Sequence, residues 1–383
     1  MLYSLRRLSF IWYKTGQTSI VSIIFINRKY KIVQIYFSIG GTKLELVPIR
    51  GEQQMQMQVS CPQCTATTVI KKGKQTTKNN VIQRYQCTLC NTTFIPRGFP
   101  HKTYRAQVII DTLTTYNRGY TLKETQTIIN KKYKTHTTTS TIQRWIHEQA
   151  DTCTYSRLRP ILSNTYSPDT IIVSKHFTYN GLAYNFKYHR GKHGLLGSLF
   201  PTLATYIQRF ENGCPTFFSE IEHRCSTQKL PITIQKKEDT NIVNKLTTLA
   251  LNSNPAPAAR HAHVETFLLL NDHATVAVEV PVWFWEKRPG FGIAGHIDII
   301  QIRDGRVYIL DYKPDAAKQN NQTVASQLYL YARGLSFRTN IPLEQIRCAY
   351  FDEKTYHEFL PKEAIVSYPQ KATHEIHDRK IYM

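Results

Sequence analysis

Two aspartates and a lysine in the C-terminal third have residue types and spacing suited to phosphate chemistry. Asp298 stands in the run Gly-His-Ile-Asp, and Asp311 and Lys313 belong to the tripeptide Asp-Tyr-Lys. Two carboxylates can hold a hard divalent cation, which polarises a phosphate oxygen and lowers the pKa of a bound water. A neighbouring lysine can position that water and stabilise developing negative charge. The pattern indicates metal-dependent hydrolysis of a phosphodiester, although an ordinary surface hairpin can carry the same residue types.

A β-hairpin is the element that must position these three side chains. Residues 294–302 and 307–312 have the composition of strands, and the Asp-Gly pair between them is typical of a tight turn. The hairpin places Asp298 and Asp311 on neighbouring strands. Because side chains two apart in a strand share a face, Lys313 is expected beside Asp311.

Two predicted helices on either side of the hairpin add further candidates. His261 and Glu265 are four residues apart on a helix that precedes the hairpin, where they share a face and offer a third metal ligand. Gln327 and Tyr331 have the same spacing on a helix over residues 322–334. Both of these side chains can reach the metal site or a bound DNA substrate.

A strand over residues 275–283, which contains Glu279, and another over 346–351 complete the order helix, strand, strand, strand, helix, strand. With the motifs HxxxE, GxxD, DYK and QxxxY in succession, residues 256–383 resemble the RecB-type branch of the PD-(D/E)XK nuclease superfamily. The resemblance implies an α/β restriction-endonuclease-like core, in which helices flank a mixed sheet.

The resemblance also implies a role for each motif residue. The ligands of a magnesium or manganese ion would be His261, Asp298, Asp311 and the backbone carbonyl of Tyr312. Lys313 would be catalytic, and Gln327 and Tyr331 would orient the substrate or the active site. Some relatives carry an iron–sulfur cluster on four cysteines, three of them after QxxxY. Here only Cys348 follows that motif, so no iron–sulfur cluster is expected.

Two Cys-x-x-Cys pairs nearer the N-terminus predict a structural zinc site. Cys61 and Cys64 are separated from Cys87 and Cys90 by 22 residues, and the stretch between them can form a β-hairpin that brings the pairs together. Four thiolates give a closed tetrahedral zinc site, which stabilises a minidomain too small for a core of its own. The insert is rich in lysine and Arg84 follows it, so contact with DNA phosphates and a merely solvated face are both open.

A proline-free segment after the cysteine pairs predicts the three helices of a helix-turn-helix module. A first helix over 104–117 is followed by two capping-box patterns, Thr121 to Glu124 and Ser140 to Gln143, which mark the starts of the next two helices. The last helix would enter the DNA groove. Its exposed side chains are expected to be Thr141, Gln143, Arg144 and His147. Any three-helix bundle can show this pattern, but the preceding basic ribbon favours DNA binding.

Residues 61–150 resemble the DNA-binding region of certain insertion-sequence transposases, in which a ribbon of the form CPxC…RYxCxxCxxxF precedes a helix-turn-helix. The matching residues are Cys61, Pro62, Cys64, Arg84, Tyr85, Cys87, Cys90 and Phe94. In those transposases a following strand ends on the first catalytic aspartate of an RNase H-like core. Here the strand over 170–174 runs into Lys175 and His176 instead. If this chain were such a transposase, it would therefore lack the first metal ligand of the catalytic core.

The composition agrees with a DNA-binding protein of several domains. The 383 residues carry a formal net charge of +22, which favours a polyanionic partner, and 41% hydrophobic residues are enough for buried cores. The longest apolar run near the start is far shorter than the ~20 residues of a membrane span, and no secretory signal is recognised. The cysteines outside the two pairs are scattered, as in a reducing compartment. We expect a cytoplasmic, DNA-associated protein with no membrane partner, and its oligomeric state is open.

The chain is expected to be a multidomain α+β protein of five parts. These are an N-terminal extension (1–56), a zinc ribbon (57–98), a helix-turn-helix module (101–152), an intermediate segment (165–255) and the nuclease core (256–383). Either the extension forms an additional hairpin, or the working start is Met55 or Met57 and the extension is not part of the protein. The second alternative is favoured. The intermediate segment should contain a hairpin at 177–184 and a helix at 195–210. Its cluster of basic and aromatic residues at 187–193 either guides DNA or is a solvated loop.

Two functional hypotheses follow. In the first, the ribbon and the helix-turn-helix select a DNA site, and the C-terminal core hydrolyses phosphodiester bonds with magnesium or manganese. In the second, the chain is a transposon-derived DNA-binding regulator or accessory protein with a nuclease-like core that does not cleave. The complete set of Asp298, Asp311 and Lys313 favours cleavage, because a decayed core should have lost one of them.

Overall fold

The computed structural model describes three strands within residues 11–38, residues 61–94 with short gaps, and residues 104–367 with short gaps at 163–164, 180, 217, 219–220, 254 and 287–290. The chain divides into two compact units, residues 1–58 and 59–383. In the first unit an antiparallel sheet contains β1 (Ile11–Thr15), β2 (Thr18–Asn27) and β3 (Ile32–Ser38) in that order. The methionines considered as alternative starts, Met55 and Met57, lie outside the described residues.

A small three-stranded sheet follows the first cysteine pair. Its strands are β4 (Val69–Thr77), β5 (Asn80–Cys87) and β6 (Thr93–Phe94), and all neighbouring strands are antiparallel. The pairing of β4 with β5 is the hairpin predicted between the two cysteine pairs. Because β5 ends on Cys87, the hairpin returns the chain to the first pair.

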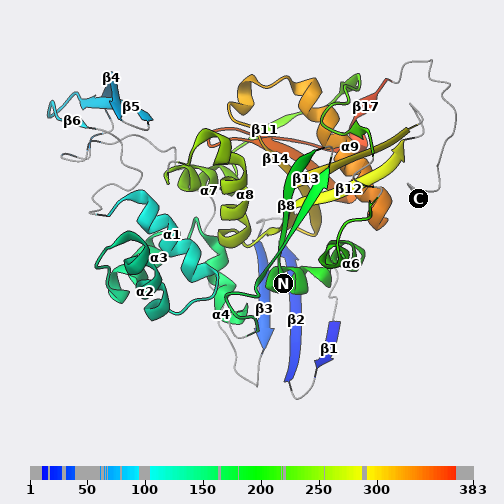
Figure 1. The fold of residues 1–383 in the computed structure, drawn as a ribbon, viewed down its shortest axis with the longest axis horizontal. Coiled ribbons are helices and arrows are strands. Elements are labelled where there is room, and N and C mark those ends of the chain that lie inside the picture. Colours follow the sequence, from blue (N-terminus) through cyan, green and yellow to red (C-terminus); the bar gives the residue numbers. More distant parts are fainter. Residues whose placement is uncertain are drawn as a thin grey trace, which may run out of the picture. The chain divides into compact units, whose positions relative to one another are not determined.

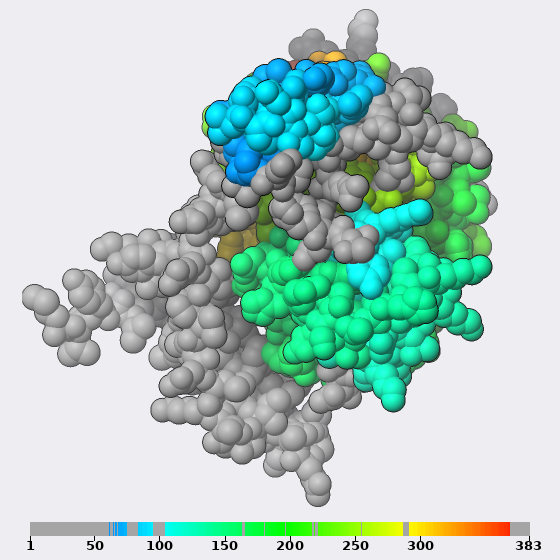
Figure 2. Space-filling model, turned by 90° about the vertical axis from the view of Figure 1, so that its left-hand side faces the viewer, coloured from blue at the N-terminus to red at the C-terminus, as the bar shows by residue number. Residues whose placement is uncertain are grey.

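Three helices occupy the segment predicted to be helical, and they form the cyan-to-teal surface in Figure 2. They are α1 (Ala106–Asn117), α2 (Leu122–Tyr133) and α3 (Thr139–Glu148). The capping box predicted at the start of α2 is present, because the Thr121 side chain accepts from the Glu124 backbone N–H and the Glu124 carboxylate accepts from Thr121. The box predicted from Ser140 is wrong. Thr138 caps α3 instead, since its hydroxyl accepts from the Thr141 N–H and the helix begins one residue before Ser140.

A nine-stranded mixed sheet runs through residues 172–359 (Figure 1). Its main path is β11-β16-β15-β14-β13-β12-β8-β7, and β9 pairs with β13. The pairs β14–β15 and β9–β13 are parallel, and the other described pairs are antiparallel. The bounds are β7 (Ile172–Tyr179), β8 (Leu182–His189), β9 (His223–Arg224), β11 (Lys237–Asp239), β12 (Thr275–Glu286), β13 (Phe291–Arg303), β14 (Arg306–Tyr312), β15 (Ile346–Phe351) and β16 (Tyr356–Phe359). A separate pair joins β10 (Ile232–Thr233) to β17 (Ile365–Val366).

The predicted hairpin that carries the two aspartates is present as β13 and β14. Its turn residues Asp304 and Gly305 both have positive φ, 49° and 67°, as a two-residue hairpin turn requires. The order helix, strand, strand, strand, helix, strand is also present: α8 (Arg260–Asn271), β12, β13, β14, α9 (Asn321–Thr339) and β15.

The intermediate segment contributes to the same sheet. The hairpin predicted around residues 177–184 is β7–β8, whose turn includes Gly181 with φ +73°, and β8 pairs with β12 through Tyr188 and Lys187. The single helix expected at 195–210 is wrong. The chain forms α5 (Arg190–Gly197) and α6 (Pro201–Arg209), because Pro201 lacks the N–H that a continuous helix needs and suits a first helical position.

Two hydrophobic cores hold the helices against the sheet. One joins α6 and α9 to sheet residues that include Val282 and Ile297. The other joins α7 (Ile242–Leu251), α8 and α1 to sheet residues that include Val278 and Ile299. The short helix α4 (Arg159–Leu162) follows the three-helix segment. Both cores are contiguous with β13, so the strand that carries Asp298 is fixed from both sides.

Candidate active site

Three side chains from three elements converge at the end of the β13–β14 hairpin. The His261 Nε2 atom, on α8, lies 3.1 Å from Asp298 Oδ2 on β13 and 3.9 Å from Asp311 Oδ1 on β14. Asp311 is fully buried and Asp298 nearly so. One ligand atom from each residue can lie within 4.8 Å of the others. An imidazole nitrogen and two carboxylates in this arrangement fit a magnesium or manganese ion.

The position of His261 is held by Glu265, one turn further along α8. The Glu265 carboxylate lies 2.7 Å from His261 Nδ1 and is itself buried. A carboxylate on the second ring nitrogen orients an imidazole whose other nitrogen faces a metal. His263, two residues away, contacts Ser253 and the Ala250 carbonyl instead. The i, i+4 spacing therefore identified the histidine that reaches the carboxylates.

Lys313 lies beside Asp311, as the strand alternation predicted. Its Nζ atom is 2.8 Å from Asp311 Oδ2, and its backbone N–H donates to the Phe351 carbonyl on β15. Burial opposes the charge of this lysine, but Asp311 and then Asp298 outweigh it and raise the pKa of Lys313. The ammonium therefore stays charged beside the carboxylate pair.

The two aspartates respond differently to this environment. Burial, and then the charge of Asp311, raise the pKa of Asp298 well above its usual range. Burial also opposes ionisation of Asp311, but Lys313 and His261 outweigh it and lower the pKa of Asp311 to about 2. Burial disfavours a charge on His261, yet the hydrogen bonds to Asp298 and Asp311 raise the pKa of His261. A cation held by His261, Asp298 and Asp311 would take the place of the His261 proton.

Gln327 and Tyr331 contact each other and the sheet rather than solvent. The Gln327 side-chain amide donates to the Tyr331 hydroxyl over 3.0 Å, and both residues are buried. A Cβ at Gly295 would lie 2.8 Å from the Tyr331 ring. The glycine of the GxxD motif therefore makes room for the tyrosine of the QxxxY motif. This contact supports β13 three residues before Asp298.

Two charged residues near His261 were not among the predicted site residues. Glu279 can offer a carboxylate oxygen to a group with His261 and Glu265. Its backbone has φ +52° within β12, which is strained for a glutamate. Burial, and then the charge of Glu265, raise the pKa of Glu279 to about 9. Its signal in the sequence is an acidic residue inside an otherwise apolar strand.

Lys187 is the second residue, and it comes from β8 outside the predicted core. Its Nζ donates to the Thr266 hydroxyl over 2.9 Å. Burial lowers the pKa of Lys187, while Glu265 and Glu279 oppose that change. In the cluster at 187–193, Tyr188, His189 and Lys192 are buried, whereas Lys187, Arg190 and His193 are partly exposed.

The four paired cysteines come together at the end of β5. Cys61 Sγ lies 3.4 Å from Cys90 Sγ, and Cys64 Sγ lies 3.5 Å from Cys87 Sγ. All four sulfurs lie within 4.8 Å of one another, which fits one tetrahedral zinc ion. Arg84 on β5 is exposed.

The predicted groove-facing residues lie along α3. Gln143, Arg144 and His147 are exposed and form the exposed face of α3. Thr141 is only partly exposed, and its N–H contributes to the helix cap. Ile142 and Trp145 are buried on the opposite face.

Comparisons with known proteins bear on the C-terminal half. No curated protein and no solved structure matches the chain. Among the described residues, none of the helices combines the length and the apolar character that a membrane crossing requires. The model of the PD-(D/E)XK nuclease superfamily matches residues 217–379, which include the whole set from His261 to Tyr331. This segment of the chain is therefore similar to the domain that defines the PD-(D/E)XK nuclease superfamily.

Proposed function

We propose that the protein is a divalent-metal-dependent deoxyribonuclease of the RecB-like type, which hydrolyses phosphodiester bonds in DNA. The observation that carries the proposal is the convergence of His261, Asp298 and Asp311 with Lys313 at 2.8 Å from Asp311. The ion would be magnesium or manganese, held by His261, the two aspartates and the backbone carbonyl of Tyr312. When bound, it would supply a polarised phosphate oxygen and an acidified water.

The residues around the ion have separate tasks in this proposal. Lys313 is charged, so its ammonium can orient the attacking water and stabilise negative charge on the phosphate. Glu265 fixes the orientation of the His261 ring through Nδ1. Gln327 and Tyr331 pack α9 against β13, and this packing holds Asp298 in position.

We also propose that the N-terminal parts of the second unit select the DNA. Four sulfurs at mutual ligand distance support a structural zinc ion on Cys61, Cys64, Cys87 and Cys90. The exposed face of α3 supports insertion into a DNA groove, with Thr141 at its start and Arg84 on β5 as a phosphate contact. The net charge of +22 supports a large electrostatic contribution to binding.

Cleavage of circular and linear DNA by the purified full-length protein, with and without magnesium or manganese, tests the proposal. Asp311→Asn keeps the shape of the side chain but removes a carboxylate ligand, so cleavage should fall by orders of magnitude while DNA binding survives. Lys313→Ala should keep metal binding, measured by manganese titration, and still cleave slowly. Asp304→Asn, in the turn at the other end of the same hairpin, is the matched control and should cleave normally.

Unchanged metal-dependent cleavage by Asp311→Asn would contradict the assigned site. Absence of cleavage by the unmodified protein with either metal, together with retained DNA binding, would favour a regulator with a nuclease-like core instead.

A further inference from the structure

A cavity of about 230 Å³ lies beside the metal-ligating residues, on the opposite side of Tyr312. Tyr312 stands between Asp311 and Lys313 at the end of β14, and Arg260 precedes His261 on α8. Because neighbouring side chains of a strand point to opposite faces, Tyr312 turns away from the carboxylates and lines this cavity. The cavity therefore lies next to the site, because Arg260 precedes His261 in the chain and Tyr312 follows Asp311.

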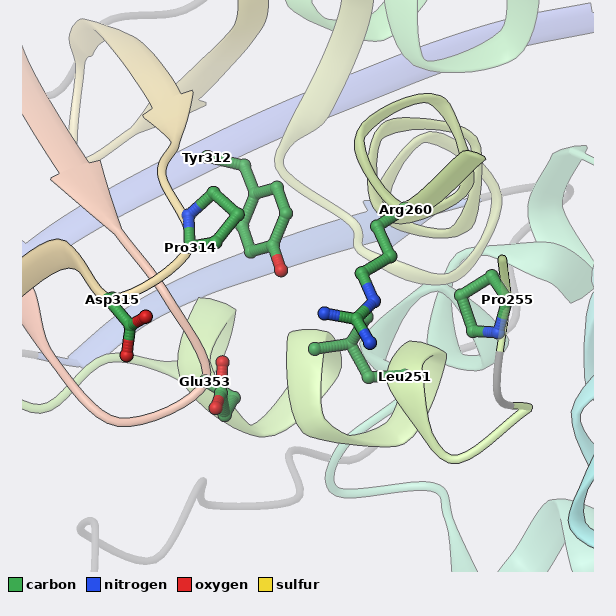
Figure 3. Close-up of a pocket in the computed structure, with 7 residues that line it drawn as sticks. All are labelled: Leu251, Pro255, Arg260, Tyr312, Pro314, Asp315 and Glu353. Carbon is green, nitrogen blue, oxygen red and sulfur yellow. The ribbon is translucent and has the colours of Figure 1, made fainter. Parts of the chain in front are cut away.

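Two hydrogen-bond donors face the cavity without a partner. Figure 3 shows the Arg260 guanidinium and the Tyr312 hydroxyl pointing into the same space. Tyr312 is only 2% exposed, whereas Arg260 is exposed, and among the described residues neither group has a hydrogen bond or an ion pair. Both groups donate, so they suit an anionic oxygen such as that of a phosphate.

The rest of the lining has a different chemistry. Leu251, Pro255 and Pro314 supply apolar walls, and Asp315 and Glu353 add two carboxylates, the second from the loop after β15 (Figure 3). The Asp315 carboxylate lies 3.6 Å from Lys318 Nζ, and the Glu353 carboxylate lies 3.9 Å from Lys354 Nζ. Glu353 is not paired with Arg260. Apolar walls suit the faces of a nucleobase, and a carboxylate accepts hydrogen bonds from a base amino group.

We infer that this cavity is a subsite for the nucleotide next to the scissile phosphate, with its phosphate on Arg260 and Tyr312 and an amino-bearing base facing Glu353. The inference rests on the proposed nuclease function for its place in the reaction. Adenine, cytosine and guanine carry such an amino group, whereas thymine does not. A base in this cavity is out of the duplex stack, so short single strands are the appropriate probes.

The first test measures binding without metal, so it does not depend on cleavage. Deoxycytidine and thymidine monophosphates are titrated into the full-length protein in EDTA by calorimetry. The cytidine nucleotide should bind about tenfold more tightly, and Arg260→Ala should weaken it about tenfold. Glu353→Gln should remove the preference over thymidine, because an amide can donate to thymine. Arg306→Ala, an exposed arginine at the other end of β14, is the control and should change neither affinity.

The second test follows cleavage of single-stranded oligonucleotides in which each position in turn lacks its base. One position next to the cut should lower kcat/KM about tenfold, and Arg260→Ala should abolish that sensitivity. Equal affinity for the two nucleotides in the unmodified protein, unaffected by Arg260→Ala, would overturn the subsite. Failure to cleave any oligonucleotide would overturn the nuclease proposal alone, since the titration decides the subsite independently.

Discussion

Lys192 provides a prediction about stability that follows from its complete burial. Its Nζ donates to the backbone carbonyls of Leu269 and Asp272 at the end of α8, and its charge lies 5.1 Å from the Tyr155 ring. Burial lowers the pKa of Lys192 to about 7, although Asp272 opposes the change. The lysine thus ties α5 to the helix that carries His261, at the expense of its own charge.

The sign of the pH dependence follows from the two states. The unfolded chain keeps Lys192 protonated up to a pKa of about 10.4. Between pH 7 and that value the unfolded chain binds more protons at this residue than the folded one, so stability rises with pH. At pH 7 about half of the folded molecules still have Lys192 protonated, so the full slope of about 1.4 kcal/mol per pH unit is reached only above that pH. The gain in stability from pH 7 to pH 9 is therefore ~2 kcal/mol.

Lys192→Met keeps the length of the side chain and removes the ionisable group. From pH 7 to pH 9 the variant should lose about 2 kcal/mol of stability relative to the unmodified protein, because only the unmodified protein gains stability at this residue as the pH rises. Urea unfolding at pH 7, 8 and 9 measures this difference, with the exposed Lys245→Met on α7 as the control. A difference that stays constant across the three pH values would refute the argument, since Lys192 would then be equally charged in both states.

Three further predictions concern the supports of the site and the N-terminal modules. Gly295→Ala should destabilise the protein by ~2 kcal/mol in thermal unfolding and slow cleavage, because its Cβ would displace the Tyr331 ring; an unchanged melting temperature would contradict the close approach. The purified protein should contain about one zinc per chain by elemental analysis, and Cys61→Ser with Cys64→Ser should remove it without changing the unfolding of the nuclease core; full zinc content in that variant would exclude the site. Replacing the exposed face of α3 by alanines in the full-length chain should weaken DNA binding about tenfold and reduce its dependence on salt, and equal binding at every salt concentration would show that DNA is bound elsewhere.

The parts of the site that follow from local patterns were predictable from the sequence. Strand alternation placed Lys313 beside Asp311, the turn residues set the hairpin, and helical spacing placed His261 over Glu265. Each of these relations joins residues within one element or one hairpin. Their geometry depends on the local backbone, so the pattern fixes it before any tertiary packing.

Relations between distant segments were not predictable in the same way. Glu279 reaches the site through a backbone conformation that no propensity favours for glutamate. In the sequence, Lys187 and Lys192 look like members of a charged surface cluster. In the structure, β8 and α5 place them against α8, at residues that lie more than 70 positions later in the chain. Burial of a lysine depends on its tertiary partners, and those partners are carbonyls and hydroxyls that leave no motif.

The pairing of β8 with β12 has a consequence for where the nuclease domain can be separated from the rest of the chain. A fragment that began where the family match begins, at residue 217, would lose β7 and β8 and leave the backbone of β12 unpaired around Ala277 and Val278. An open, apolar strand edge is a template for aggregation or for strand exchange between copies. The smallest fragment that keeps this sheet intact therefore starts before Ile172. The β7–β8 hairpin is structurally part of the nuclease-like core rather than of the modules proposed to bind DNA.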